Sequence, residues 1–315
     1  MSGFHEAVLS TFAVERIAGP LCAVGGYSRQ LLPDAPREQW SAWHVPSDCT
    51  RIEQCLLTAP GDVTGHLRIV VFHGCNQQVM RSSQHVWDSG GIFDVDIYSR
   101  DATATYQALQ RHGWTAFSDP VAYSFGELKV REVVINGPDG LAIGLIERQA
   151  PPLDWPAGLG AMTRAFNTSQ IVRDYASAAA FYRDVLGWEP LIELSVTGRD
   201  EPAAVIGLPM PFCEAVERRI GIWHPDGTNA GSVELIQCAG IAARDFSATA
   251  IAPNVGLLSL RFPVEDAGAT AAAIRRRGGQ LYTEPMELEI APYGSVTLFS
   301  IRTPDGAILE FYSAA

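Results

Sequence analysis

The feature that most constrains the fold of this chain is a strand–helix–strand pattern that recurs four times. It is clearest in Asn167–Trp188, which reads NTSQIVRDYASAAAFYRDVLGW. Thr168–Arg173 alternates in side-chain character like a short strand, and Asp174 stands where a helix N-cap is expected. One apolar helical face then precedes the helix-ending Gly187, and it consists of Ala178, Phe181, Tyr182 and Val185. This stretch predicts a strand that feeds a helix through an aspartate cap.

The other three units begin near residues 6, 93 and 257. Their first strands are predicted at 6–16, 93–100 and 257–264, and helices are predicted at 102–112 and 266–277. Two or three strands follow in every unit. These later strands are predicted at 50–58, 66–73, 115–123, 127–136, 141–147, 203–208, 218–224, 231–238, 280–290, 295–302 and 307–312.

Local alignments indicate that the pattern is a true repeat. Residues 65–74 match residues 231–240 in length and apolar pattern. Val130–Ile146 matches Val296–Tyr312 without a gap, and each contains a Pro-Asp-Gly turn that suits a tight hairpin. Odd units therefore resemble odd units, and even units resemble even ones. The alternative is a generic α+β protein with similar hairpins.

A chain of 315 residues is too long for one ordinary core and suggests two domains. The best boundary is the stretch QAPPLDWPAGLGAM at 149–162, which contains three prolines and two glycines. We predict an amino-terminal domain at 1–150 with the first two units, a linker at 151–162, and a carboxyl-terminal domain at 163–315 with the last two.

Composition narrows the classes of function. The formal charge of −12, from 35 acidic and 23 basic residues, argues against general binding to a nucleic-acid backbone. No apolar run is long enough to cross a bilayer, and the N-terminus lacks the pattern of a signal peptide. The six cysteines are scattered without a CxxC pair, which predicts reduced thiols in a cytoplasmic protein. HExxH, GxGxxG, GxxxxGK[ST] and GxSxG motifs are missing, so their usual activities lack support.

Two stretches resemble a known family. FYRDVLGW at 181–188 and TPDGAILEFY at 303–312 are similar to segments of the vicinal oxygen chelate superfamily. That superfamily includes glyoxalase I, extradiol ring-cleaving dioxygenases, methylmalonyl-CoA epimerase, and the fosfomycin and bleomycin resistance proteins. The resemblance implies an α+β fold of four βαβββ modules, paired into two half-open barrels around ligand cavities. Because such relatives share a scaffold and differ in chemistry, function has to come from the residues of the site.

The resemblance also implies where a divalent metal would be held. Family members that bind one take a ligand from the start of a module's first strand, seven residues before the helix cap, and another from the last strand. With Arg16 taken as the cap of the first module's helix, these places in the first half of the chain hold Leu9, Arg68, Asp94 and Gly144. A Leu, an Arg and a Gly cannot form a metal cage, so the amino-terminal domain is expected to bind no metal.

In the second half the same places hold Asn167, Glu234, Ser259 and Glu310. Two carboxylates, an amide and a hydroxyl are ligands for hard ions such as Mg²⁺, Mn²⁺ or Ca²⁺, and Zn²⁺ is a further candidate. Both histidines of a two-His-one-carboxylate iron site are missing, which disfavours oxygen activation. The alternative is structural, because Glu234 could pair with nearby arginines and Glu310 with Arg261 as buried ion pairs.

Three further residues are expected to contact a substrate. Arg261 shares the cavity-facing side of its strand with Ser259, and Trp223 and Tyr293 stand near predicted cavity mouths. Aromatic residues at a mouth favour a ligand with a flat or apolar body. In the second module, Asp94 and Asp96 face the cavity by alternation and are expected as solvated or paired carboxylates.

Two functions remain open. In the first, Glu234 and Glu310 are catalytic carboxylates that hold a metal for lyase, isomerase or epimerase chemistry on a small metabolite. In the second, the protein sequesters a small molecule without catalysis, as bleomycin resistance members do. The oxygen ligands favour the enzyme, and the missing histidines favour the binding protein. Either could be a monomer or a homodimer, with no nucleic-acid or membrane partner.

Overall fold

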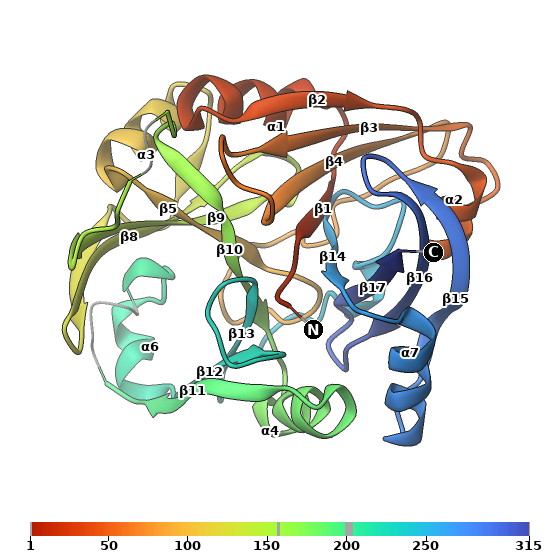
Figure 1. Ribbon diagram of the computed structural model, residues 1–315. Helices are drawn as coiled ribbons and strands as arrows, with labels where there is room; N and C mark the ends of the chain where they lie inside the picture. The colour runs from red at the N-terminus through yellow and green to blue at the C-terminus, as the bar shows by residue number, and fades with distance from the viewer. Residues whose placement is uncertain (1, 156–157, 199–203, 315) are drawn as a thin grey trace.

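The chain forms two curled β-sheets, and the helix that follows the first strand of each module lies on an outer face (Figure 1). The structure is a computed structural model that describes residues 2–155, 158–198 and 204–314. Within these ranges, no helix is both long enough and apolar enough to span a membrane.

The first module runs from residue 6 to residue 73. It comprises β1 (Glu6–Ser10), α1 (Glu15–Pro20), η1 (Leu21–Gly25), β2 (Ser28–Leu32), α2 (Arg37–Ala42), β3 (Arg51–Thr58) and β4 (His66–His73). Its first strand is shorter than the predicted 6–16. Helix α1 follows Val14, which makes no side-chain cap hydrogen bond, so Arg16 lies inside the helix and not at its cap.

The second module has the predicted strand, aspartate cap and helix. It comprises β5 (Asp94–Ser99), α3 (Ala102–Gln110), β6 (Thr115–Ala116), β7 (Val121–Phe125), β8 (Leu128–Asn136), η2 (Pro138–Gly140) and β9 (Ala142–Ala150). The carboxylate of Asp101 accepts a hydrogen bond from the N–H of Ala104 and so caps α3. The Pro-Asp-Gly sequence forms the turn between β8 and β9, as expected.

The third module contains the stretch in which the repeat is clearest. It comprises β10 (Met162–Ile171), α4 (Tyr175–Ala180), η3 (Phe181–Leu186), β11 (Glu189–Val196), α6 (Met210–Ala215), β12 (Arg218–His224) and β13 (Ser232–Cys238). Asp174 caps α4, and Gly187 ends the helix with a φ of 75°. The strand predicted at 203–208 is wrong for 204–208, and residue 203 lies outside the described residues. Its place in the sheet is taken by β11.

The fourth module repeats the second. It comprises β14 (Gly256–Pro263), α7 (Ala267–Arg276), β15 (Leu281–Ile290), β16 (Gly294–Arg302) and β17 (Ile308–Ala314), and a short turn η4 (Ser247–Thr249) precedes it. Asp266 caps α7 through the N–H of Ala269. The α+β fold of four βαβββ modules is therefore confirmed.

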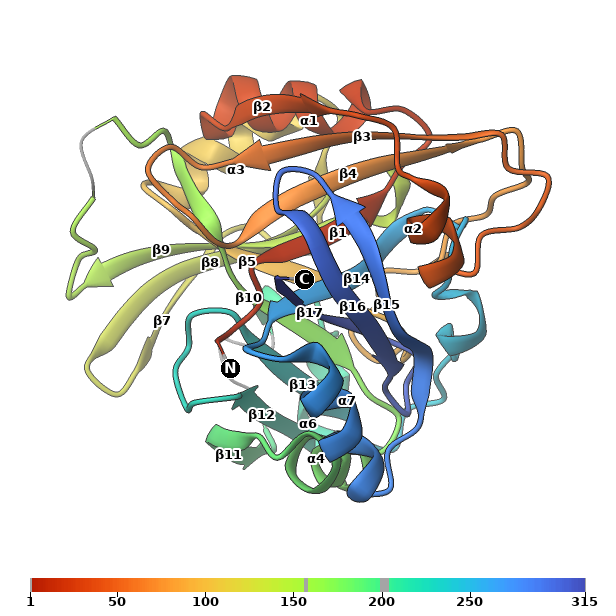
Figure 2. The same cartoon turned by 45° about the vertical axis from the view of Figure 1, so that its right-hand side comes forward.

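The modules pair differently from the expectation. The eight-stranded sheet has the order β15-β16-β17-β14-β1-β4-β3-β2, and the nine-stranded sheet has the order β11-β12-β13-β10-β5-β9-β8-β6, with β7 on β8. The first module thus shares a sheet with the fourth, and the second with the third. We expected the first with the second and the third with the fourth. Figure 2 shows β1 and β14 side by side at the centre of one sheet.

The antiparallel pairing of first strands explains this arrangement. Val8 pairs with Ser259 where β1 meets β14, and Asp96 pairs with Asn167 where β5 meets β10. Each such pair joins one module from each half of the chain. The sheets therefore do not follow the linker at 151–162, of which residues 156–157 lie outside the described part. Whether 1–150 and 163–315 are separate folding domains stays a prediction.

The two faces of each sheet have different cores. The largest apolar cluster packs the four module helices against the convex faces of both sheets. Along β17, for example, Leu309 and Phe311 point into this cluster, whereas Ile308 and Tyr312 lie in smaller clusters on the concave face. Glu310 shares the concave face because successive strand residues alternate. Each sheet therefore curls into a half-open barrel whose interior is distinct from the helix layer.

Candidate functional site

Each half-open barrel brings four strands together at its centre. In the eight-stranded sheet, β1 and β14 lie between β4 and β17, and in the nine-stranded sheet, β5 and β10 lie between β9 and β13. The concave faces of these strands hold the positions at which the sequence predicted metal ligands. The two barrels carry different side chains there.

The barrel of the first and fourth modules contains a chain of buried ion pairs, and we call it the ion-pair barrel. Arg68 Nε lies 2.6 Å from Glu6 Oε1, and Arg261 Nη1 lies 2.6 Å from the same oxygen. Arg261 Nε lies 2.5 Å from Glu310 Oε2. All four side chains are at most 1% exposed. The charges alternate along the chain and cancel.

Neutral groups complete the ion-pair barrel. Glu310 Oε1 accepts hydrogen bonds from Ser259 Oγ at 2.7 Å and from Trp43 Nε1 at 2.6 Å. The hydroxyl of Tyr293 donates to Glu6 Oε2 at 3.0 Å. Burial opposes the ionisation of Glu6, but the positive charges of two arginines outweigh it and lower the pKa of Glu6 to about 2. Both carboxylates are therefore already neutralised by the protein.

Among the residues that the structure describes, the barrel of the second and third modules holds four carboxyl groups, and we call it the acidic barrel. They belong to Asp94 and Asp96 on β5, Glu132 on β8 and Glu234 on β13. The aspartates are buried and the glutamates are half-buried, so the cluster keeps some contact with solvent.

Burial raises the pKa of Asp94 to about 6 and that of Glu132 to about 7. Burial and the charges of Asp94 and Glu132 raise the pKa of Glu234 to about 8. Burial and its acidic neighbours also raise the pKa of Asp96 well above its usual value. The cluster therefore retains protons near neutral pH.

Hydrogen bonds orient three of the four carboxyl groups. The N–H of Ser169 donates to Asp94 Oδ1 at 3.0 Å, Tyr123 donates its hydroxyl to Glu132, and Asn167 Nδ2 lies 3.5 Å from Glu234 Oε2. No arginine or lysine in the described part of the chain forms an ion pair with any of the four. Among these four carboxyl groups, Asp94 is the one whose pKa the charge of Arg81 lowers, although burial outweighs this effect. The acidic barrel lacks the neutralising partners of the other barrel.

Asp96 occupies a notch that a glycine leaves open. It pairs in register with Gly144 on β9 and with Asn167 on β10. A Cβ atom at position 144 would lie 2.0 Å from Asp96 Oδ1, so only glycine leaves room for this carboxyl group. Asp96 is 6% exposed, and burial and the negative charges of its acidic neighbours raise its pKa. Such a group favours a proton or a bound cation beside it.

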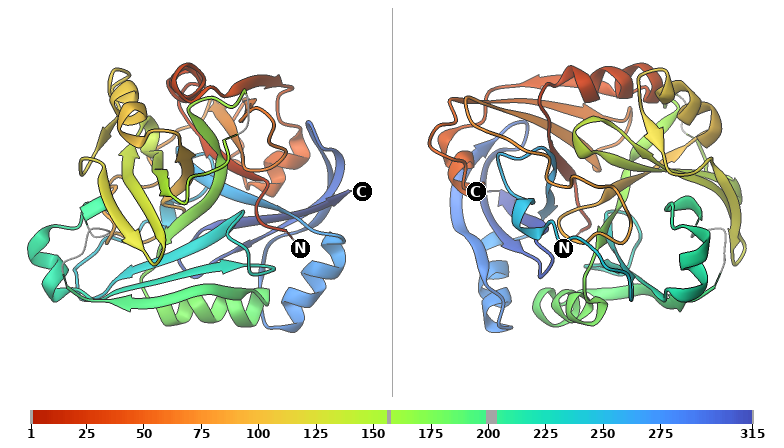
Figure 3. Two further views of the ribbon diagram at one scale, coloured as in Figure 1. Left: turned by 60° about the vertical axis from the view of Figure 1, so that its left-hand side comes forward. Right: turned by 180° about the vertical axis from the view of Figure 1, so that it is seen from behind.

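Four aromatic side chains lie near α6 on the concave side of the acidic barrel, and we call this part of the barrel its mouth. The rings of His85 and Trp87 stack with centroids 4.4 Å apart, Phe117 lies 5.7 Å from His85, and Phe212 of α6 meets Trp87 edge-on at 6.0 Å. Phe117 and Phe212 are 47% and 40% exposed. Helix α6 lies inside the curl of the nine-stranded sheet (Figure 3). It packs there on an apolar cluster that includes Phe93, Val134 and Ile236, neighbours of the carboxyl groups in sequence.

The two barrels differ in their fit to a divalent cation. In the ion-pair barrel, Arg68 occupies a predicted ligand position, and Arg68 and Arg261 together hold both carboxylates, so a metal does not fit. In the acidic barrel, Asp96, Asn167 and Glu234 offer oxygen donors of the kind that hard cations accept, and within the described residues no arginine or lysine forms an ion pair with these carboxyl groups. Within the residues that the structure describes, no three acidic, histidine or cysteine side chains converge as a metal-holding group. Binding would therefore need some side-chain movement.

The structure divides the four predicted metal ligands between the barrels. Asn167 and Glu234 lie together in the acidic barrel, and Ser259 and Glu310 lie together in the ion-pair barrel. The expectation of a single four-ligand site is therefore wrong, because third and fourth modules do not share a sheet. The structural alternative for Glu310 and Arg261 describes their geometry correctly.

The three predicted substrate-binding residues also lie apart. Arg261 and Tyr293 belong to the ion-pair barrel, where both contact Glu6. Trp223 is fully buried in the helix-side core, next to Tyr182 at 6.3 Å between ring centroids. Its neighbour Ile222 pairs with Glu234 and takes the concave face instead. Trp223 therefore does not reach either site, because the strand alternation places it on the opposite face.

Two site residues were missed from the sequence. Glu6 holds the position assigned to Leu9, which packs in the helix-side core. Leu9 was assigned because Arg16 was taken as the cap, whereas Arg16 lies inside α1. Glu6 and Val8 lie on the same face of the strand, and this alternation could have identified Glu6. Glu132 was missed because its strand was placed correctly but its face was not considered.

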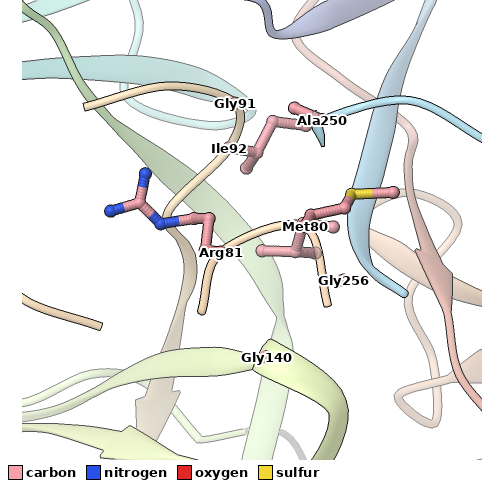
Figure 4. A pocket seen from close by; sticks show the side chains of 8 residues that line it. Met80, Arg81, Gly91, Ile92, Gly140, Ala250 and Gly256 are labelled. Atoms are coloured by element: carbon pink, nitrogen blue, oxygen red, sulfur yellow. The ribbon is translucent and has the colours of Figure 1, made fainter. Parts of the chain in front are cut away.

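A void between the barrels is not a candidate site. Met80, Ile92 and Ala250 line it, and the guanidinium of Arg81 points away from it (Figure 4). It leaves no space for a water-sized molecule. Two grooves of about 440 and 450 Å³ lie on the outer surface, between η3 and α7 and between η1 and α3, away from both barrels.

Comparison with known proteins supports the fold. Residues 164–311 match the model of the Glyoxalase/Bleomycin resistance protein/Dioxygenase superfamily. Glyoxalase I from Zea mays has a similar structure, with 16% identity and a TM-score of 0.64 over 99% of this chain and 92% of that chain. A Bacillus subtilis protein provisionally described as a dioxygenase has 11% identity and a TM-score of 0.57, over 99% and 85% of the two chains. No curated protein sequence matches the chain.

Proposed function

We propose that this chain, whose carboxyl-terminal half belongs to the Glyoxalase/Bleomycin resistance protein/Dioxygenase superfamily and whose whole length has that fold, is an enzyme that moves a proton on a small substrate in the acidic barrel. The observation that supports it is the cluster of four carboxyl groups with raised pKa values. Groups that titrate near neutral pH can both donate and accept a proton during turnover. Isomerase, epimerase or lyase chemistry needs this ability.

The residues of the acidic barrel suit distinct roles. Glu234 is half-buried, and its pKa of about 8 makes it the general acid or base that faces the substrate. The amide of Asn167 positions Glu234 and can donate to a substrate oxygen. Asp96 and Glu132 keep the shared negative charge low by holding protons. A hard divalent cation held by Asp96, Asn167 and Glu234 would add Lewis-acid polarisation of a substrate oxygen.

The mouth of the acidic barrel favours a substrate with a flat or apolar body. Trp87, Phe117 and Phe212 provide aromatic surface above the apolar cluster, and the carboxyl groups lie on the same concave face. Small-molecule sites commonly combine an apolar lining with a few polar groups in this way. The six free cysteines support the expected cytoplasmic location, and monomer or homodimer both remain compatible with four modules in one chain.

Cation binding is tested by titrating the full-length protein with Mg²⁺, Mn²⁺, Ca²⁺ and Zn²⁺ and following Tm. We expect an upward shift for at least one ion, lost in Glu234→Gln and kept in Ser259→Ala, since Ser259 lies in the other barrel. Loss of the shift in Ser259→Ala would instead support a site in the ion-pair barrel. Gly144→Ala should also abolish the shift, because its methyl group displaces Asp96.

Proton transfer is tested with a panel of carbonyl compounds that carry an acidic C–H bond beside the carbonyl group. NMR in D₂O would detect enzyme-dependent exchange of that hydrogen for deuterium. We expect exchange on a compound with an aromatic or apolar body, reduced at least about 100-fold in Glu234→Gln, the size typical of losing a general acid–base group. Exchange at the wild-type rate in that variant would contradict the assignment of Glu234.

The second candidate is sequestration of a small apolar molecule without catalysis. The exposed aromatic mouth favours it, since binding there needs no acid–base group. Ligand binding that is unchanged by chelators and by Glu234→Gln, with no deuterium exchange on any compound, would favour this function over the enzyme.

A further inference from the structure

Cys49 and Cys75 lie at the open end of the β3–β4 hairpin. Cys49 comes two residues before β3, and Cys75 two residues after β4. The last paired residues of this ladder are Arg51 and His73, and the N–H of Thr50 donates to the carbonyl of His73 at 2.7 Å. The antiparallel strands therefore deliver the two cysteines to the same place. This end of the hairpin lies beside α2 (Figure 2).

The two thiols share one environment. Both cysteines pack in the same apolar cluster, with Cys49 buried and Cys75 half-buried. The thiol of Cys49 donates to the carbonyl of Arg51 at 3.6 Å, and Cys49 is, after burial, the largest cause of the raised pKa of Cys75. Burial, followed by this neighbour, raises the pKa of Cys75 to about 11. Both thiols are free, and Cys75 is the one that solvent reaches.

The other four cysteines form two pairs that interact less directly than Cys49 and Cys75. Cys22 and Cys55 act on each other only through charge, as do Cys213 and Cys238. The thiol of Cys213 donates to the carbonyls of Leu208 and Pro209. These pairs serve as internal controls for any chemistry of Cys49 and Cys75.

We propose that Cys49 and Cys75 are a modification site that forms a reversible disulfide by exchange with a small-molecule disulfide such as oxidised glutathione. Because its pKa is raised, only a small fraction of Cys75 is ionised at pH 8, and this thiolate attacks one sulfur of the small disulfide, which releases one thiol and leaves a mixed disulfide on Cys75. The Cys49 thiolate then attacks the Cys75 sulfur and releases the second thiol. Two protein thiols are oxidised, one small disulfide is reduced to two thiols, and the two protons from the cysteines end on the released thiols.

The disulfide would join two segments that meet the barrels. Cys49 ends the loop that carries Trp43, whose indole N–H donates to Glu310. Cys75 begins the segment that crosses between the barrels, where Gln77 and Gln78 hydrogen-bond to Pro253 and Asn254. Oxidation would therefore link the loop that carries Trp43, which contacts the ion-pair barrel, covalently to the segment that crosses between the barrels.

The test is to incubate the full-length protein with oxidised glutathione at pH 8 and map its peptides by mass spectrometry without reduction. We expect a Cys49–Cys75 linked peptide pair, no glutathione retained on either residue, and reversal by a reducing agent. Cys49→Ser and Cys75→Ser should each abolish the linked pair, whereas Cys22→Ser should leave it unchanged.

Two results would overturn the proposal. One is a wild-type protein in which Cys49 and Cys75 stay reduced, or in which Cys75 keeps glutathione without a link. The other is a linkage of Cys22 to Cys55 or of Cys213 to Cys238 in place of the expected one. Because the wild-type map needs no substitution, it decides the question even if a variant fails to fold.

Discussion

Arg261 is the residue that holds the buried charges of the ion-pair barrel together. It lies between Glu6 and Glu310, which approach it at 2.6 and 2.5 Å, and it is fully buried. Burial alone would lower its pKa, but the two carboxylates raise the pKa above its usual value. The arrangement resembles a buried ion-pair network in which removing one member leaves an unpaired charge.

Replacing Arg261 should therefore destabilise the protein strongly. For Arg261→Met we expect a loss of about 3–5 kcal/mol in the free energy of unfolding at pH 7, because Glu310 loses its cation in a buried site. Urea unfolding followed by tryptophan fluorescence would measure it.

The matched control is Arg275→Met. Arg275 pairs with Glu284 on the surface, where the side chains are 50% and 69% exposed, so its loss should cost no more than about 1 kcal/mol. Equal losses for the two variants would show that burial of the Arg261 pairs contributes nothing.

Carboxyl groups in the two barrels should respond to pH in opposite directions. The pKa of Glu6 is lowered to about 2, so its contribution to stability is present above pH 4.5 and is lost as the pH falls towards 2. The pKa of Glu234 is raised to about 8, so the folded protein binds its proton more tightly. That contribution is present below pH 4.5 and is lost as the pH rises through 8.

Glu234→Gln should remove the loss of folding stability that the wild type shows as the pH rises towards 8. We expect the variant to be close to the wild type in stability at pH 5 and to be more stable by about 3–4 kcal/mol at pH 8, since the amide is never charged. Denaturant unfolding at pH 5, 6, 7 and 8 would measure the difference. A constant difference across this range would contradict a raised pKa for Glu234, and a saturating divalent cation should shrink it.

At the scale of elements, the Pro-Asp-Gly turns join modules that do not share a sheet. Asp139, in the turn before β9, accepts hydrogen bonds from the hydroxyl of Thr11 and the N–H of Phe12, and Arg16 Nη2 lies 2.9 Å away. Asp305, in the equivalent turn before β17, accepts from the N–H of Arg173 at 2.9 Å. The turn aspartate of each even module thus accepts a backbone N–H group just after the first strand of the preceding odd module.

Asp139→Asn should weaken this junction. The amide tolerates the positive φ of 59° but cannot neutralise Arg16, so we expect a loss of about 1–3 kcal/mol, typical of a hydrogen bond to a charged group. Thermal and urea unfolding would measure it against Asp119→Asn, whose side chain is exposed. A cost no larger than that of Asp119→Asn would mean that the turn does not join the modules energetically.

At the scale of the whole molecule, each sheet needs both halves of the chain. Separate expression of 1–150 and 163–315 leaves β1 and β5 without β14 and β10. We expect each half alone to aggregate through these unpaired strand edges and the two halves to co-purify when expressed together. Size-exclusion chromatography and circular dichroism would measure both outcomes. Two monomeric, folded halves would instead support the division into separate domains predicted from the linker.

The sequence by itself determined the repeated unit. Alternation, the aspartates at 101, 174 and 266, and the glycine at 187 are local signals, and each acts on residues within one or two helical turns. The Pro-Asp-Gly turns are equally local. For this reason the four modules, most strand limits and the fold family could be predicted without a structure.

Only the tertiary structure decided which modules share a sheet, and so which side chains meet. Asn167 and Glu234 were predicted together and lie together, because one module contains both. Ser259 and Glu310 also lie together, but far along the chain from Glu6 and Arg68, which complete their barrel. Pairing between first strands depends on contacts between distant parts of the chain, 71 residues apart for Asp96 and Asn167 and 251 residues apart for Val8 and Ser259, and no local pattern encodes it. That pairing gave one barrel two arginines that neutralise its acids and left the other with four carboxyl groups that share protons.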